Sequence, residues 1–240
     1  MCTIVFAYRM LDAPVAVAAN RDEALDRASI PPRPRGSDPV VVAPRDRAAG
    51  GTWIGHTDRG LLVAIANRWL TDGPSGERSR GQLVADALDS PTLPAALRTV
   101  ERELATRTYD PFTLVLADDR RAVLVEWTTT VRVRPLARGV HVVVNVGSDG
   151  RYTIPDERRA ASVRQIHVAE RLRAALAPRP EETVDTWLGR AADWLADHRV
   201  GACVHGDRFG TRSSSLIALG PDRRSFRYAD GPPCRTEYHS

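Results

Sequence analysis

The chain has 240 residues, 42% of them hydrophobic, which suits a single large domain over residues 1–240 with a substantial core. Its net charge of +4 comes from scattered arginines, since it contains no lysine, and it lacks the long basic helix and interleaved aromatics of a nucleic-acid-binding protein. It has no apolar run long enough to span a membrane and no signal-peptide pattern, so we expect a cytoplasmic protein without a membrane span.

The N-terminal part of the chain predicts strands. Two apolar runs, Thr3 to Tyr8 and Val15 to Ala19, are separated by a short turn and predict a hairpin. Residues 30–36 contain three prolines, which remove backbone donors, so we expect a surface loop there. Further strands are expected at 40–43, after Gly50-Gly51, and at 60–67, where Asn67 ends an apolar run.

Helices and strands then alternate in groups. The helical spacing of apolar residues predicts one helix from Ser79 through Leu88 and another from Ser90 through Leu104. Two later helices are predicted over residues 155–176 and 183–198. The remaining strands are predicted at 112–117, 122–127, 131–134, 140–145, 202–205, 214–219 and 225–229. Because the strands come in hairpins and no phosphate-binding glycine motif occurs, we expect an α+β sandwich with helices covering sheets.

Cys2 is the residue around which the chemistry is expected. It follows the initiator methionine, whose removal would leave one residue with both a thiol and a free α-amine. The thiolate is a strong nucleophile, and an amine with a pKa of ~7.7–8 can take and return a proton near neutral pH. This combines nucleophile and base in one residue. The predicted hairpin would place Asn20, Arg21, Asp22 and Glu23 beside Cys2.

Five stretches together resemble a known family. Met1-Cys2-Thr3, residues 19–23, 50–55, 60–68 and 211–215 resemble the NRDE family, whose animal members are called transport and Golgi organisation protein two. The pattern is also similar, more remotely, to the N-terminal-nucleophile hydrolases that cleave penicillin V and conjugated bile salts. That resemblance implies a four-layer αββα sandwich with Cys2 at its centre.

The hydrolase resemblance implies catalytic roles for six polar residues: Cys2, Arg21, Asp22, Asn67, Asn145 and Arg212. Cys2 would attack a carbonyl carbon. Arg21 would lie by the thiol and favour its thiolate, as a nearby cation does. Asp22 would hold the α-amine in place. The two asparagines end strands and would offer side-chain amide donors to the oxyanion or to the amine. The last arginine would close the polar network.

One departure from the hydrolases affects these assignments. The hydrolases separate their arginine and aspartate by two residues, whereas Arg21 and Asp22 are adjacent. Neighbours in a strand point to opposite faces, so both reach Cys2 only if the strand ends or bulges there. Asn20 or Glu23 could take the place of Asp22 in holding the amine. Both residues are also candidates for substrate binding, together with Trp53, which is expected in the core or in a pocket wall.

No metal site is predicted. The three cysteines, Cys2, Cys203 and Cys234, are far apart and form no disulfide framework or CxxC pattern. Cys203 and His205 alternate on one face of a predicted strand but have no further ligand pair, so we expect a structural role. The remaining histidines are isolated in the sequence, and each stays open as a haem ligand: His56, His141, His167, His198 and His239.

Two functions of different kinds remain open. The first is hydrolysis of an amide or thioester through a Cys2 acyl intermediate, which requires no cofactor. If Cys2 is N-terminal and lies near Arg21, its thiol pKa should fall below the free value of ~8.5. The second, implied by the family resemblance, is a non-catalytic protein that binds and traffics haem, acyl-CoA or lipid inside the cell. Both agree with an anionic or acyl-bearing small-molecule partner, because arginine suits carboxylates and phosphates. The sequence leaves the oligomeric state open.

Overall fold

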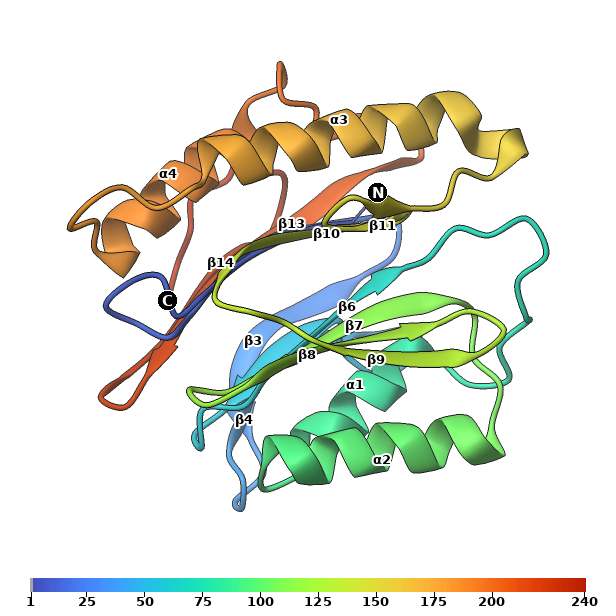
Figure 1. The fold of residues 1–240 in the computed structure, drawn as a ribbon, viewed down its shortest axis with the longest axis horizontal. Coiled ribbons are helices and arrows are strands. Elements are labelled where there is room, and N and C mark those ends of the chain that lie inside the picture. Colours follow the sequence, from blue (N-terminus) through green and yellow to red (C-terminus); the bar gives the residue numbers. More distant parts are fainter. Residues whose placement is uncertain (1) are drawn as a thin grey trace. The chain divides into compact units, whose positions relative to one another are not determined.

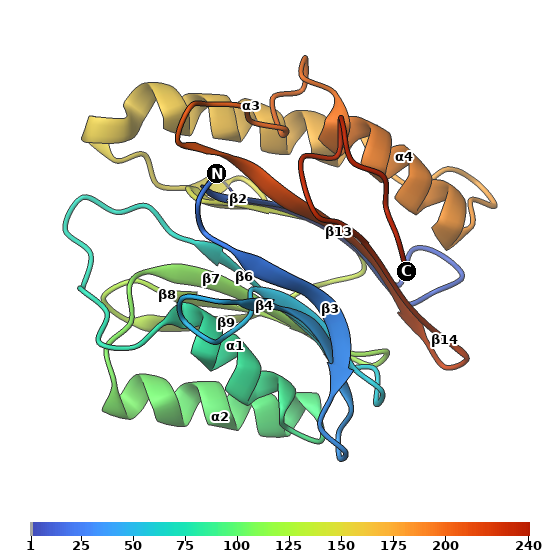
Figure 2. The same ribbon diagram turned by 180° about the vertical axis from the view of Figure 1, so that it is seen from behind.

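The computed structural model describes residues 2–240 and contains antiparallel sheets and helices, which confirms the predicted α+β class (Figures 1 and 2). The chain divides into two compact units. One combines the N-terminal segment up to Asp26 with Ala137–Ser240, and the other is Arg27–Leu136. Each unit contains one seven-stranded sheet and one pair of long helices, which are the two kinds of layer that an αββα sandwich requires.

The first unit holds the sheet that carries Cys2. Its strand order is β12-β11-β10-β1-β2-β13-β14. Helices α3 and α4 lie along one face of this sheet (Figures 1 and 2), α3 against β10 and β1, and α4 against β2 and β13. The elements are β1 (Thr3–Tyr8), β2 (Val15–Ala24), β10 (Gly139–Val144), β11 (Gly147–Ser148), β12 (Arg151–Tyr152), η1 (Asp156–Arg158), α3 (Arg159–Ala175), α4 (Val184–Ala196), β13 (Phe209–Gly220) and β14 (Arg223–Ala229).

The predicted N-terminal hairpin is confirmed. Strand β1 runs between β2 and β10, and its side chains are buried on both faces of the sheet, which agrees with its unbroken apolar sequence. Thr3 pairs with Asn20 on β2 and with Val144 on β10. Strand β2 continues to Ala24, beyond the predicted end at Ala19, because β13 pairs with its polar second half.

The C-terminal region corrects one prediction. Residues 202–205 were expected to form a strand, but they lie in the connection between α4 and β13 without regular secondary structure. In place of a strand ladder, a side chain contacts this segment: Asn20 on β2 donates a hydrogen bond to the Ala202 carbonyl at 3.0 Å. At the end of the chain, an isolated β-bridge joins His239 to Tyr228 on β14.

The second unit contains the sheet β3-β4-β5-β6-β7-β8-β9 and the helices α1 and α2, which cover one of its faces (Figures 1 and 2). Its core is formed by the strands and both helices, with Tyr109 and Phe112 among its largest buried side chains. The elements are β3 (Ser29–Arg35), β4 (Val41–Asp46), β5 (Ile54–Thr57), β6 (Leu62–Asn67), α1 (Arg80–Leu88), α2 (Leu93–Thr106), β7 (Phe112–Ala117), β8 (Ala122–Trp127) and β9 (Val131–Pro135).

The proline-rich stretch is a strand, so the predicted loop over residues 30–36 is wrong. Strand β3 lies at the edge of its sheet, where proline is tolerated because one side of the strand has no ladder to complete. Its pairing with β4 becomes irregular between Ile30 and Arg33, which flank Pro31 and Pro32.

Within residues 2–240, none of the helices combines the length and the apolar character needed to cross a membrane.

Candidate active site around Cys2

Cys2 lies immediately before the central strand of the first sheet. The pairing of Thr3 with Asn20 on one side and Val144 on the other brings the next residues of both neighbours, Arg21 and Asn145, beside Cys2. The Cys2 backbone N–H donates a hydrogen bond to Asn145 Oδ1 at 3.0 Å. Its thiol donates to the backbone carbonyl of Asp22, with the sulfur 3.8 Å from the oxygen. Cys2 is therefore held from both flanking strands.

Asn145 acts through its side-chain oxygen. Oδ1 also accepts a hydrogen bond from Gln165 Nε2 on α3 at 2.8 Å, and both side chains are buried. Two donors on one oxygen fix the orientation of the amide, so Asn145 is an acceptor toward the Cys2 nitrogen and not the donor that was expected there. The sequence predicted Asn145 but missed Gln165. Its only signal was a polar residue on the inward face of a predicted helix.

Arg21 and Asp22 are both buried beside Cys2, although they are adjacent on β2. The irregularity that the sequence required lies in the partner strand: Thr211 pairs with Asp22 and Ser213 with Arg21, so Arg212 is an extra residue in β13. The Asp22 carboxylate accepts a hydrogen bond from the Thr211 hydroxyl at 2.6 Å. Asp22 thus reaches the Cys2 thiol through its backbone and reaches β13 through its side chain.

In the chain that carries Met1, the surroundings of Cys2 raise the pKa of its thiol. The lowered pKa expected for an N-terminal Cys2 stays a prediction. Burial raises the pKa of Cys2 above its ordinary value, and the nearby Asp22 charge raises it further. The Arg21 guanidinium lowers the pKa, as predicted, but its effect is the smaller one. Burial also raises the pKa of the Asp22 carboxyl, which the hydrogen bond from Thr211 opposes. In the chain that carries Met1, the thiol is therefore protonated at neutral pH. Met1 itself lies outside the described residues.

The other predicted residues of this unit have different surroundings. Asn20 donates from Nδ2 to the carbonyls of Leu195 and Ala202, so its amide ties α4 and the following connection to β2. Glu23 lies 3.7 Å from the Arg21 guanidinium. Arg212 is half-buried at the bulge, and its Nε has no hydrogen-bond partner among residues 2–240. The roles predicted for Asn20, Glu23 and Arg212 toward a substrate stay predictions.

Asn67 and Trp53 belong to the second unit. Asn67 is the last residue of β6, as predicted, and pairs with Phe112 on β7. Trp53 precedes β5 and packs against the core of its own unit, which agrees with its expected role as a core or wall residue. Their convergence on Cys2 stays a prediction.

One cluster outside the Cys2 site corrects the sequence analysis. Cys203 and His205 were expected to have no further ligand pair, but His198 and Cys234 lie beside them. His198, which appeared isolated in the sequence, has its ring centroid 5.0 Å from that of His205. The four residues are separated by irregular spacings, which is why no motif indicated them.

Comparisons with known proteins identify the family and the fold of the chain. A family model described as transport and Golgi organisation 2 matches residues 1–228. A transport and Golgi organization protein 2 homolog from Bos taurus is 33% identical over 132 residues, covering 49% of this chain and 45% of that protein. The chain thus matches less than half the length of this curated relative.

Two solved structures show the same fold. Penicillin V acylase from Agrobacterium tumefaciens aligns with 96% of this chain and 83% of its own, at a TM-score of 0.62 and 16% identity. A variant of conjugated bile acid hydrolase from Clostridium perfringens covers 96% of this chain and 89% of its own, at a TM-score of 0.62 and 13% identity. These likenesses confirm the expected N-terminal-nucleophile hydrolase fold, and the family match shows that the chain belongs to the transport and Golgi organisation 2 family.

Proposed function

We propose that the protein hydrolyses an amide or a thioester through an acyl intermediate on Cys2, once Met1 has been removed. The observation that carries the proposal is the pair of contacts made by Cys2. Its nitrogen is held at 3.0 Å by Asn145, and its sulfur lies 3.8 Å from the Asp22 carbonyl. The atom that would become the free amine and the atom that would attack are therefore both fixed in one polar network.

The chemistry follows from placing nucleophile and base in one residue. The thiol proton passes to the α-amine, and the sulfur attacks the substrate carbonyl carbon to form a C–S bond. The bond from that carbon to the leaving nitrogen or sulfur then breaks, and the leaving group takes the proton. Water attacks the resulting thioester, releases the carboxylic acid, and returns the proton to Cys2. No redox partner or cofactor is needed for this balance.

The raised thiol pKa sets a requirement on the first step. A protonated thiol is a poor nucleophile, so the α-amine must act as its base. Removal of Met1 creates that amine. The hydrogen bond from the Cys2 nitrogen to Asn145 then orients the amine, and Gln165 orients Asn145.

The test compares the Met1-free protein with Cys2→Ala on a panel of amide and thioester substrates. We expect turnover and a transient acyl adduct, visible by intact mass, in the wild type only. Cys2→Ser should retain a trace, because the amine remains while the hydroxyl is a poorer nucleophile. Circular dichroism serves as the folding control. Equal hydrolysis rates in the wild type and in Cys2→Ala would end the proposal.

Gln165 provides a second test, as a positioning residue that acts through Asn145. Gln165→Leu removes the 2.8 Å hydrogen bond to Asn145 Oδ1, so the amine loses its fixed acceptor. We expect kcat to fall about 10–100-fold while KM changes little, because the substrate itself is not contacted. The matched control is Gln82→Leu, which loses a similar hydrogen bond to the Ala49 carbonyl in the other unit. A KM effect alone would contradict the positioning role.

A binding role is the second candidate, favoured by the raised pKa of Cys2, which suits an inert thiol. The ligand would be haem, acyl-CoA or another lipid, and the protein would act in the cytoplasm. For haem, His141 is a poor axial ligand, because one ring nitrogen contacts the Asp149 carboxylate at 2.8 Å and the other the Ala137 carbonyl at 2.9 Å. Titration of the wild type and of Arg21→Ala with haem and with acyl-CoA tests this role. Tight binding without turnover would favour it.

A further inference from the structure

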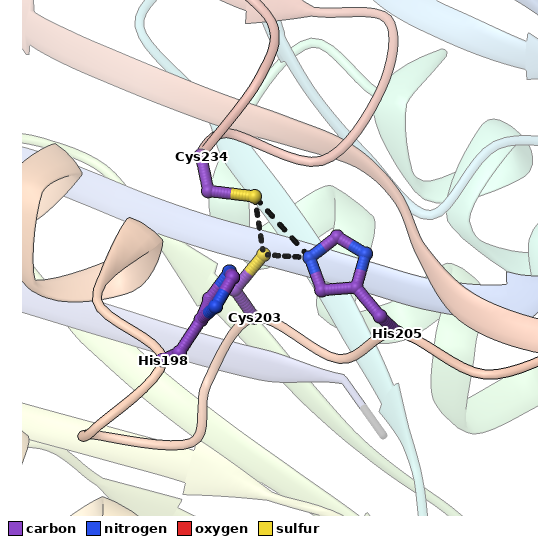
Figure 3. A group of neighbouring side chains, drawn as sticks. All are labelled: His198, Cys203, His205 and Cys234. Atoms are coloured by element: carbon purple, nitrogen blue, oxygen red, sulfur yellow. Dashed lines mark hydrogen bonds between the residues drawn. The ribbon is translucent and has the colours of Figure 1, made fainter.

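Two cysteines and two histidines meet near the C-terminal end of the first unit. His198, Cys203 and His205 lie in the connection between α4 and β13, and Cys234 lies in a turn after β14. One potential ligand atom from each residue lies within 4.8 Å of the others. Figure 3 shows the four side chains pointing toward one another from these two separate segments. All three cysteines of the chain are free thiols, so no disulfide joins this pair.

The distances between these ligand atoms are close to the edges of a tetrahedral metal site. The two sulfurs are 3.6 Å apart, and His205 Nε2 lies 3.5 Å from Cys203 Sγ and 3.2 Å from Cys234 Sγ. Ligands at ordinary zinc distances and tetrahedral angles would be separated by about 3.8 Å for two sulfurs and about 3.6 Å for sulfur and nitrogen. Three corners are therefore already in place. The exposed His198 supplies the fourth, because one of its ring nitrogens lies within 4.8 Å of the other three ligand atoms.

Both segments that carry the ligands are fixed by contacts outside the cluster. The Val204 N–H, between Cys203 and His205, donates to Thr211 Oγ1 at 2.9 Å, and the Val204 carbonyl accepts from the Thr211 N–H at 2.8 Å. On the other segment, the Tyr238 hydroxyl lies 2.7 Å from that of Ser214 on β13. The ligands are thus held close together by the fold, which lowers the cost of ordering them on binding.

We propose that His198, Cys203, His205 and Cys234 bind one structural zinc ion. A ligand set of two cysteine thiolates and two histidine imidazoles favours tetrahedral zinc. Four protein ligands close the coordination sphere, so the ion cross-links the α4–β13 connection to the C-terminal segment and activates no water. Binding converts two thiols to thiolates and releases two protons to solvent, without a change of oxidation state.

The proposal goes beyond the proposed hydrolysis but connects to its site. Thr211, which holds Val204 inside the cluster, also donates its hydroxyl hydrogen bond to Asp22. The Thr211 hydroxyl therefore links the backbone between two of the proposed zinc ligands to Asp22 in the candidate active site. A cross-link at the cluster would restrain the segment on which Thr211 depends.

The first experiment measures the metal directly. The full chain is purified under reducing conditions, and bound zinc is measured by elemental and native mass spectrometry. We expect one zinc per chain, and, after exchange, a cobalt(II) spectrum with intense visible bands of tetrahedral coordination and a thiolate charge-transfer band. The proposal is refuted if the reduced protein, given zinc and then dialysed, retains less than one zinc per chain. It is also refuted if cobalt gives only the weak bands of octahedral coordination.

Variants then assign the site. His205→Asn and Cys234→Ser should each weaken zinc binding more than about tenfold, since each removes a ligand. The matched controls are His167→Asn, an exposed histidine on α3, and Cys2→Ser, a cysteine outside the cluster; both should bind zinc as the wild type does. Equal zinc affinity in all four variants would place the metal elsewhere and refute the proposal.

Thiol protection tests the wild type, so the result does not depend on a variant that folds. Zinc should slow iodoacetamide labelling of Cys203 and Cys234, mapped by peptide mass, and leave Cys2 unchanged. If zinc protects neither thiol, the proposal fails. It also fails if protein prepared without reductant carries a Cys203–Cys234 disulfide and the reduced form still takes up no zinc.

Discussion

At the scale of single residues, two neighbours of opposite charge act on the same thiol in opposite directions. Arg21 and Asp22 are adjacent on β2, and both are buried. The Asp22 charge raises the pKa of Cys2, whereas the Arg21 charge lowers it. The two substitutions that remove these charges should therefore have opposite effects on the thiolate population at a given pH.

We expect Asp22→Asn to lower the pKa of Cys2 and to speed its alkylation by iodoacetamide at pH 7, and Arg21→Gln to slow it. A change of one pKa unit would alter the labelling rate about tenfold. Because burial raises the pKa, labelling of the Met1-bearing wild type should keep increasing with pH beyond the ordinary thiol range of ~8.5. Peptide mapping across a pH series measures this. Changes of the same sign in both variants would show that access to the thiol, not charge, controls the rate.

At the scale of elements, strand β13 brings the two halves of the first unit together at Thr211. The Thr211 hydroxyl accepts from the Val204 N–H and donates to the Asp22 carboxylate. Both bonds lie next to the bulge at Arg212, where the register of β13 against β2 changes. The hydroxyl therefore supports the part of the strand at which ladder hydrogen bonds are interrupted.

Thr211→Val tests this role because it removes the hydroxyl and keeps the shape. We expect a loss of about 1.5–3 kcal/mol in the free energy of unfolding, since the hydrogen bond goes to a charged group in a buried site. The matched control is Thr113→Val on β7, a fully buried threonine whose hydroxyl has no partner among the described residues. That change should be close to neutral. Equal costs in urea denaturation of the two variants would contradict the assigned role.

The second unit contains a polar network at the C-terminal part of α2. Glu103 accepts hydrogen bonds from the Tyr109 hydroxyl at 2.7 Å and from Arg78 at 2.6 Å. These contacts, the one from Tyr109 first, lower the pKa of Glu103. A lowered pKa means that the ionised carboxylate is favoured in the folded state, so its contribution is present above the unfolded value of ~4.3 and is lost as the pH falls through the folded value.

We therefore expect Glu103→Gln to lower Tm at pH 6 and to reduce the further decrease in Tm between about pH 5 and pH 3. The control is Glu101→Gln, at an exposed position on the same helix. Differential scanning calorimetry over a pH series measures both variants. A Glu103→Gln protein whose Tm falls with acid as steeply as the wild type would show that the network does not contribute.

At the scale of the whole molecule, the two units differ in how the chain builds them. The second unit is one continuous segment, Arg27–Leu136, whereas the first requires residues from both ends of the chain. Strand β1 pairs with β2, its neighbour in sequence, and with β10, which lies more than a hundred residues later. The candidate active site therefore forms only when both ends of the chain have folded together.

Hydrogen exchange should reflect this organisation. The central strands β1 and β6 have ladder partners on both sides and buried side chains, so we expect their amides to exchange most slowly. The edge strands β3 and β9 have one partner each and should exchange faster. Peptide-level mass spectrometry at several times measures the order. If the amides of β3 exchanged as slowly as those of β6, the proline-rich strand β3 would be protected by something other than its own sheet.

The sequence by itself determined the local elements and the neighbours of Cys2. Apolar periodicity and turn residues identified the hairpin β1–β2, the helices α1 to α4 and most strands, because these signals depend on residues close together in the chain. The hairpin in turn placed Arg21 and Asp22 beside Cys2. These local patterns predicted an α+β sandwich, and the family resemblance added the N-terminal-nucleophile hydrolase type of fold.

Only the tertiary structure decided the contacts that join distant segments. Asn145 meets Cys2 across 143 positions, and Gln165 comes from a helix whose inward polar residue has no distinctive sequence signal. The sequence required an irregularity near Arg21 and Asp22 but did not place it at Arg212 in β13. It also missed the proline-containing strand β3 and the two residues, His198 and Cys234, that lie beside Cys203 and His205. Each depends on which strand or loop lies alongside, and that is set by the packing of the whole core rather than by the order of residues within one element.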